Sequence, residues 1–125
     1  MSIDQLQHVN IRCADAKRSR DFYVGLLGLL DGDRPPFASV GYWLYVGELP
    51  AIHLVQRTAQ HGPAVSGSGT IDHIAFRGTD LAGMRTRLDA AGVHYTVEVV
   101  PRDGAIQLFL FDPDGIRIEL NYAPS

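Results

Sequence analysis

The sequence predicts an α+β fold in which two copies of one βαβββ module form a single small domain. The main observation is an internal repeat, in which LQHVNIRCAD, beginning at Leu6, matches IDHIAFRGTD, beginning at Ile71, at an offset of 65 positions. A second match, of AIHLV from Ala51 with RIELN from Arg117, follows in the same order at an offset of 66. Two such matches are harder to attribute to chance than one. The predicted modules are residues 1–56 and 71–125, and the linker is residues 57–70.

Each half of the sequence has the pattern of a strand, a helix and three short strands. The first strands are expected at about Leu6–Arg12 and Ile71–Arg77, where polar and apolar residues alternate. An aspartate, Asp15 or Asp80, then follows at a position where its carboxylate can accept hydrogen bonds from the first turn of a helix. Glycines are expected to end the helices and turn signals to separate the later strands: Gly28, Gly92, Asp31-Gly32, Gly47, Asp103-Gly104 and Pro113-Asp114-Gly115.

Composition and charge exclude several classes of partner. The chain has 125 residues, of which 46% are hydrophobic and 20% charged, and this is not the composition of a disordered protein. Its net charge is −3 and it has no basic run, so we expect no binding to nucleic acid. No stretch resembles a membrane span or a signal peptide, and the lone Cys13 excludes an internal disulfide. We therefore expect a cytoplasmic protein that does not act at a membrane.

Four potential metal ligands are predicted to share one face of the strands. Side chains alternate across a strand, and the apolar residues must pack under the helices. The residues His8, His53, His73 and Glu119 take the opposite face. The repeat relates His8 to His73 and His53 to Glu119. A metal on a two-fold axis requires this arrangement, with two ligands from each half at equivalent positions. A wet sheet surface is the alternative, but the symmetry favours a site for zinc, nickel, iron, cobalt or manganese.

Five strings resemble the vicinal oxygen chelate superfamily, which includes glyoxalase I, extradiol dioxygenases, fosfomycin resistance proteins, methylmalonyl-CoA epimerase and bleomycin-binding proteins. They are QHVNIR, DFYVGLLGL, IHL, IDHIAF and FDPDGIRIEL, and the resemblance covers essentially the whole chain. It implies a cupped, mostly antiparallel mixed sheet with helices on its outer face, often completed by dimerisation, so we expect a homodimer. It also implies metal ligands on the first and fourth strands of each module, at His8, His53, His73 and Glu119.

The resemblance implies a metal-dependent enzyme acting on a small oxygenated molecule. In a glyoxalase-type lyase or isomerase, the substrate would chelate the metal while Glu119, a ligand and the expected base, takes a proton from the carbon beside a carbonyl. Arg12 lies four residues after the first ligand, at the place of an arginine that contacts glutathione in glyoxalase I. Glyoxalase I has Glu where this chain has His53, so the second potential base is absent.

Two alternatives remain open. A non-haem iron dioxygenase is the first, because His8, His73 and Glu119 make up the two-histidine, one-carboxylate set of such enzymes. The sequence signature of extradiol dioxygenases includes a tyrosine around Phe109 and a histidine near Arg102. Neither is present, which argues against ring cleavage. A non-catalytic drug- or antibiotic-binding resistance protein is the second alternative, although such relatives lack the metal ligands.

Aromatic residues are expected on the same face as the metal ligands. Trp43 aligns with Phe109 at the offset of 66, and Tyr45 shares the strand face of Trp43. An aromatic wall would suit a partly apolar substrate, and packing of the sheet or of a dimer contact explains the same residues equally well. The predicted substrate-binding residues are Arg12, Trp43, Tyr45 and Phe109.

Overall fold

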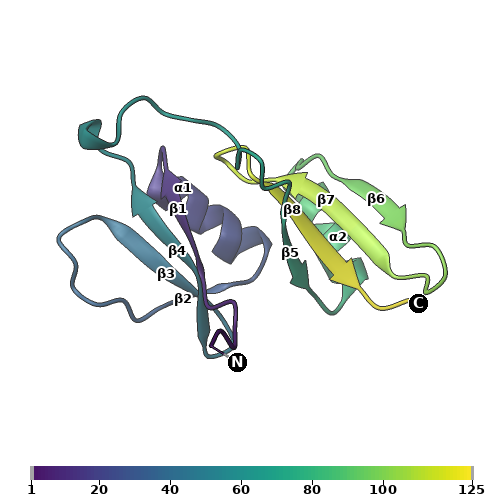
Figure 1. Cartoon of the computed structure of the whole chain (residues 1–125). Coiled ribbons are helices and arrows are strands. Elements are labelled where there is room, and N and C mark those ends of the chain that lie inside the picture. Colours follow the sequence, from purple (N-terminus) through teal and green to yellow (C-terminus); the bar gives the residue numbers. More distant parts are fainter. Residues whose placement is uncertain (1, 125) are drawn as a thin grey trace. The chain divides into compact units, whose positions relative to one another are not determined.

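The chain forms two βαβββ modules, and a computed structural model describes residues 2–124 of it (Figure 1). The modules belong to two compact units, Met1–Ala64 and Val65–Ser125. Each unit has its own four-stranded sheet of mixed direction. The predicted α+β class with two βαβββ modules is confirmed. The boundary between the units falls inside the segment that the sequence predicts to be a linker.

The first unit has its strands in the order β1-β4-β3-β2. Its elements are β1 (Val9–Cys13), α1 (Ala16–Asp21), a π-helical turn η1 (Phe22–Leu26), β2 (Leu30–Gly32), β3 (Gly41–Val46), β4 (Leu49–Gln56) and a 3₁₀ turn η2 (Ala59–His61). Strand β1 is parallel to β4, and the other neighbours are antiparallel. Helix α1 packs on β1, β3 and β4 and covers one face of the sheet.

The second unit repeats this topology with the strand order β5-β8-β7-β6. Its elements are β5 (Ile74–Arg77), α2 (Leu81–Ala90), β6 (Thr96–Val99), β7 (Ile106–Phe111) and β8 (Arg117–Tyr122). Strand β5 is parallel to β8, whereas β7 is antiparallel to both of its neighbours. None of the helices in residues 2–124 is long and apolar enough to span a membrane.

The sequence repeat extends to the register of the sheets. In the first unit Asn10 of β1 pairs with His53 of β4, and in the second unit Ala75 of β5 pairs with Glu119 of β8. These four residues are related by the same offsets of 65 and 66 that relate the sequence matches. Equivalent residues of the two halves therefore occupy equivalent places in their sheets.

Both helices begin at the expected aspartates. Asp15 accepts a hydrogen bond from the Arg18 amide at 3.1 Å, and Asp80 accepts one from the Gly83 amide at 3.1 Å. Asp80 does so from a left-handed backbone conformation with a φ of 62°. In the first unit α1 ends after six residues and the chain continues as a π-helical turn before it reaches Gly28.

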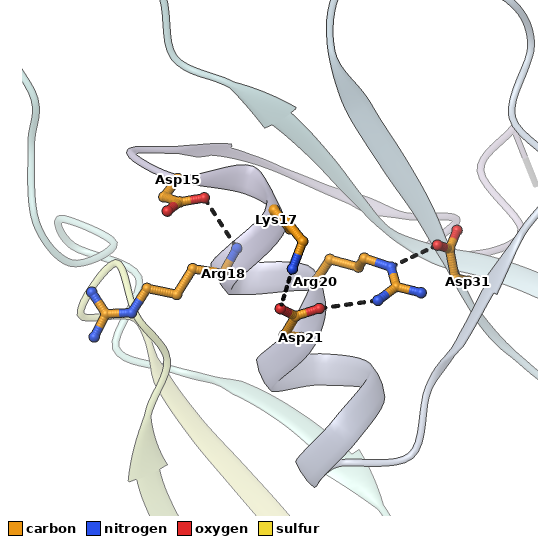
Figure 2. A network of polar contacts seen from close by, with 6 residues as sticks. All are labelled: Asp15, Lys17, Arg18, Arg20, Asp21 and Asp31. Carbon is orange, nitrogen blue, oxygen red and sulfur yellow. Dashed lines mark hydrogen bonds and ion pairs between the residues drawn. The ribbon is translucent and has the colours of Figure 1, made fainter.

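A surface network ties helix α1 to strand β2 (Figure 2). Arg20 Nε donates to Asp31 Oδ2 at 2.7 Å, and its Nη1 lies 3.0 Å from Asp21 Oδ1. Lys17 reaches the other oxygen of Asp21 from one turn earlier at 3.0 Å. The side chain of Arg18 extends away from these residues in Figure 2. The network fixes the short strand β2 against the helix, although exposed ion pairs of this kind stabilise a fold only weakly.

The core of each unit lies between its helix and its sheet. Buried apolar residues occupy alternate strand positions, as the sequence predicts: Ile11, Cys13, Leu44, Ile52 and Leu54 in the first unit, and Leu108, Leu110, Ile118 and Leu120 in the second. Phe109, between Leu108 and Leu110, is buried as well. The predicted starts of the first strands are wrong by three residues. The β1–β4 ladder begins at Val9 and the β5–β8 ladder at Ile74, because the residues before them have no ladder partner in the described chain. His8 and His73 therefore each lie immediately before a strand.

Candidate functional site

Each unit brings two of the four predicted metal ligands together. In the first unit the rings of His8 and His53 are stacked, with their centroids 3.8 Å apart and their planes at 11°. In the second unit His73 Nε2 lies 3.2 Å from Glu119 Oε1. We call these the His–His pair and the His–Glu pair. Within residues 2–124, no group of three or more His, Cys, Asp or Glu side chains is arranged to hold a metal ion.

His53 presents a nitrogen that is suited to a metal. Its side chain is only 8% exposed, and its Nε2 is buried without a hydrogen-bond partner. The backbone of Pro50 is a hydrogen-bond partner of the ring, and because proline has no N–H, its carbonyl oxygen accepts from the imidazole. Burial lowers the pKa of His53, and the charge of His8 lowers it further. Both effects favour the neutral imidazole, which is the form that binds metals.

The His53 ring is the middle one in a column of three stacked rings. Trp43 lies opposite His53 in the β3–β4 ladder and stacks on it, with the ring centroids 4.1 Å apart and the planes at 10°. His8 stacks on the other side of His53. An imidazole lone pair lies in the plane of its ring, so one ion cannot be in the planes of two stacked rings. His8 must turn out of the column to share a metal with His53, and its exposed place before β1 leaves room for that rotation.

Glu119 is held by neighbours on its own sheet. Its side chain is 9% exposed, and Asn121, two residues further along β8, donates from Nδ2 to Glu119 Oε2. The other oxygen, Oε1, faces His73. Two ligand atoms that each lie about 2.1 Å from one ion are about 3.0–3.4 Å apart at angles near 90–110°. The observed 3.2 Å between Nε2 and Oε1 fits a shared ion.

Asp72 orients His73. Its Oδ2 lies 2.7 Å from His73 Nδ1 and also accepts a hydrogen bond from Arg117 Nη1 at 2.8 Å. These two hydrogen bonds, first that of His73 and then that of Arg117, lower the pKa of Asp72, so the carboxylate stays ionised. Metal-binding histidines commonly hold a carboxylate with the nitrogen that does not bind the ion. The donor set of the His–Glu pair therefore fits a divalent metal as it stands, and that of the His–His pair fits one after His8 turns out of the column.

Phe109 completes the second pair as Trp43 completes the first. It lies opposite Glu119 in the β7–β8 ladder, is 8% exposed and meets the His73 ring edge to face at 6.1 Å. The guanidinium carbon of Arg117 lies 4.0 Å from the centre of the Phe109 ring. Arg117 therefore contacts Asp72 and Phe109 at once, and it holds the surroundings of His73 in place.

A pocket of about 420 Å³ lies beside the His–His pair within the first unit. Its lining comes from the segment before β1, from β1, from the β2–β3 loop and from β3 and β4: Gln7, His8, Asn10, Arg34, Phe37, Ser39, Trp43, His53 and Val55. Of the predicted substrate-binding residues in this unit, only Trp43 lines it. Tyr45 points its hydroxyl to the Asp33 carbonyl at 2.6 Å, and Arg12 is exposed on β1. The roles of all these residues in substrate binding stay predictions.

Sequence reasoning did not select the pocket residues of the β2–β3 loop. Arg34, Phe37 and Ser39 lie outside the strands, so the alternation of side chains assigns them to no face. Asp72 and Asn121 were also not selected. A signal for both exists in the sequence, because Asp72 directly precedes a predicted ligand and Asn121 shares the strand face of another.

The chain is similar over nearly its whole length to known proteins. The family model of the Glyoxalase/Bleomycin resistance protein/Dioxygenase superfamily matches residues 5–120. Glyoxylase I 4 of Arabidopsis thaliana is 30% identical over 126 residues, which cover 96% of this chain and 71% of that protein. Members of the superfamily commonly use divalent metals, bind small molecules and include proteins that are not enzymes.

Two crystal structures share the fold. FosX, a genomically encoded fosfomycin resistance protein from Listeria monocytogenes, has a TM-score of 0.74 at 17% identity, covering 97% of this chain and 94% of that chain. TnmS3, an antibiotic binding protein from Streptomyces sp. CB03234, has a TM-score of 0.70 at 22% identity, covering 98% of each chain. At these identities the likeness concerns the fold alone. With the family match over residues 5–120, it follows that this chain belongs to the Glyoxalase/Bleomycin resistance protein/Dioxygenase superfamily.

Proposed function

We propose that the protein is a metal-dependent enzyme of the glyoxalase type, a lyase or isomerase, in which His8, His53, His73 and Glu119 serve as ligands of divalent metal. The observation that carries this proposal is the His–Glu pair. A buried carboxylate faces an imidazole nitrogen at 3.2 Å, while separate side chains, Asn121 and Asp72, hold the remaining polar atoms of both groups. The unpartnered Nε2 of His53 supports a ligand role in the other unit.

The bound metal would act as a Lewis acid toward a substrate with two neighbouring oxygens. The residues of the chain supply the rest of the chemistry. Glu119, the one carboxylate among the four proposed ligands, would take the proton from the carbon beside the substrate carbonyl. Asp72 keeps His73 in one orientation through Nδ1. The pocket of the first unit, which His8 and His53 help to line, is large enough for a small molecule.

Metal binding tests the ligand assignment directly. Titration calorimetry of chelator-treated protein with zinc, nickel, cobalt and manganese should show binding of at least one of these ions at a fixed stoichiometry. The variants His53→Ala, His73→Ala and Glu119→Ala should each bind the preferred ion at least about tenfold more weakly while keeping the far-UV spectrum of the parent protein. His94→Ala is the matched control, since His94 is an exposed histidine outside both pairs. Unchanged metal affinity in all three ligand variants would refute the proposal.

Turnover tests the reaction. The metal-loaded protein should convert the hemithioacetal of methylglyoxal and glutathione, and Glu119→Gln should lose this activity. Oxygen consumption by the iron-loaded protein with a panel of catechols would instead support the dioxygenase alternative. A protein that binds no metal and turns over neither substrate would be a binding protein of the superfamily.

A further inference from the structure

The β2–β3 loop carries one cation into the pocket of the first unit. Arg34 lies at the start of this loop and is the one Arg or Lys among the residues that line the pocket. Its guanidinium carbon lies 5.1 Å from the centre of the Phe37 ring. The loop thus delivers a charged and an aromatic side chain to the same wall.

The charge of Arg34 has no counter-ion. Nη1 donates to the Ser39 carbonyl at 3.0 Å and Nη2 to the Ser39 hydroxyl at 3.1 Å, and both acceptors are neutral. The buried Nε has no hydrogen-bond partner. Within residues 2–124, no carboxylate forms an ion pair with Arg34, and no Asp or Glu lines this pocket. Arg34 therefore carries the one permanent charge among the residues that line the pocket.

The backbone makes room for this guanidinium at Gly41, the first residue of β3. A Cβ placed there would lie 2.9 Å from Arg34 Nη2 and 2.2 Å from the carbonyl oxygen of Leu54. The second contact is with backbone and cannot be relieved by moving a side chain. A larger residue at position 41 would thus disturb both the β3–β4 ladder and the place of Arg34.

The pocket lining is also rich in aromatic rings. His8 and Trp43 each stack on His53, with interplanar angles of 11° and 10°. Phe37 adds a tilted ring at 6.3 Å from Trp43 and is 55% exposed. A planar apolar group can pack against an outer ring of this column or against Phe37, and a carboxylate or phosphonate attached to it can take two N–H groups of a guanidinium.

We propose that Arg34 is a specificity-determining residue, which selects substrates that carry an anionic group on a flat, conjugated or apolar portion. The proposal rests on the proposed function, because it names the substrate class of the same site. It differs from the expectation for Arg12, which the resemblance to glyoxalase I suggests as the arginine that contacts substrate. A merely structural role, in which Arg34 only clasps the loop through Ser39, is the competing explanation.

The test uses the fluorescence of Trp43, which is the only tryptophan of the chain and lines the pocket. The full-length protein is titrated with 4-nitrobenzoate and with its neutral counterpart 4-nitrobenzamide, with correction for absorbance. The carboxylate should bind about tenfold more tightly than the amide, as expected for a hydrogen bond to a charged group. In Arg34→Gln the two affinities should become equal within about twofold, and Arg34→Lys should keep part of the preference.

Two further variants separate the explanations. Arg18→Gln removes the same charge from an exposed helical position outside the pocket and should keep the tenfold preference. Ser39→Ala removes one acceptor of the clasp and should keep it too, whereas a purely structural role predicts a loss in Ser39→Ala and Arg34→Lys alike. A preference that survives Arg34→Gln, or that disappears only in Arg12→Gln, would overturn the proposal. If Arg34→Gln does not fold, Arg34→Lys and Ser39→Ala still decide.

Repeating the titrations after treatment with a chelator distinguishes this proposal from the proposed function. The pocket lies within the first unit, so the dependence on Arg34 should persist without metal. A preference for the carboxylate that vanishes with the metal and ignores Arg34 would assign the anion to the metal. That result would refute the role of Arg34 and support the metal site. A protein that binds no metal but whose preference for the carboxylate still depends on Arg34 would support the role of Arg34 and refute the metal site.

Discussion

The two units place different chemistry on the same scaffold. Position 53 of the first unit is a histidine that lies between two rings and has an unpartnered nitrogen. The equivalent position 119 of the second unit is a glutamate that contacts a histidine and an amide. The order of the strands and the register at these positions are the same in both, and an aromatic residue lies opposite each of them, Trp43 in the first unit and Phe109 in the second. Duplication of a module thus fixes where a side chain lies, and one substitution then decides whether that place offers a neutral ligand or a carboxylate that can accept a proton.

Glu119→His would make the second unit resemble the first, and it should have the largest effect. The variant keeps a metal ligand but loses the carboxylate, so kcat should fall by about 10²–10⁴-fold, the range typical of a lost general base. Stopped assays with the metal-loaded protein measure the fall, and metal analysis shows whether the ion is retained. A kcat within threefold of the parent protein would exclude Glu119 as the base.

The cores of the two units should respond alike to the loss of equivalent leucines. Leu54 and Leu120 are related by the offset of 66 and are 0% and 4% exposed. Changing either to alanine leaves a cavity and should lower the free energy of unfolding by about 2–5 kcal/mol. Urea unfolding followed by circular dichroism measures both variants. A loss in only one of them would show that the two cores are not energetically equivalent.

Asp72 should matter more to the metal than to the fold. Asp72→Asn weakens the hold on His73, and the affinity for the preferred ion should fall about 10–100-fold. Asp72→Glu keeps the carboxylate and should restore part of that affinity. Calorimetry with both variants checks the prediction. Equal affinities for the parent protein and Asp72→Asn would mean that His73 does not depend on this neighbour.

The smallest effects are expected at the helix caps. Asp15→Ala and Asp80→Ala each remove one side-chain hydrogen bond to a helix amide and should cost about 1 kcal/mol of stability. Asp80→Ala should cost more than Asp15→Ala, because Asp80 has a left-handed backbone that alanine rarely adopts. Thermal unfolding of the two variants gives the order. The reverse order would argue that the backbone at position 80 relaxes in the variant.

The fold was predictable because it depends on patterns that the sequence displays. Alternation within strands, the two aspartate caps and the repeat were enough to predict two βαβββ modules. The exact strand starts were not, since the alternation continues through Leu6 and Ile71 while the ladders begin three residues later. Pairing with a neighbouring strand, which the alternation does not record, decides where a strand begins.

The candidate site was predictable in part. The strand faces group His53 with Trp43 and Glu119 with Phe109, and the register places each pair opposite one another. The stacking of His8 depends on a rotamer outside a strand, which no periodicity reveals. Arg34 comes from a loop whose path over the sheet is set by tertiary contacts, and the sequence gives no face for it.

The single cysteine and the single tryptophan both belong to the first unit. Cys13 has no exposed surface, so a thiol reagent can reach it only when β1 separates from its surroundings. Thiol labelling therefore times the opening of the first unit and is silent about the second. The native sequence therefore already contains a probe in one of its two similar units. Local opening of the first unit can be measured by the labelling rate of Cys13 without introducing another residue.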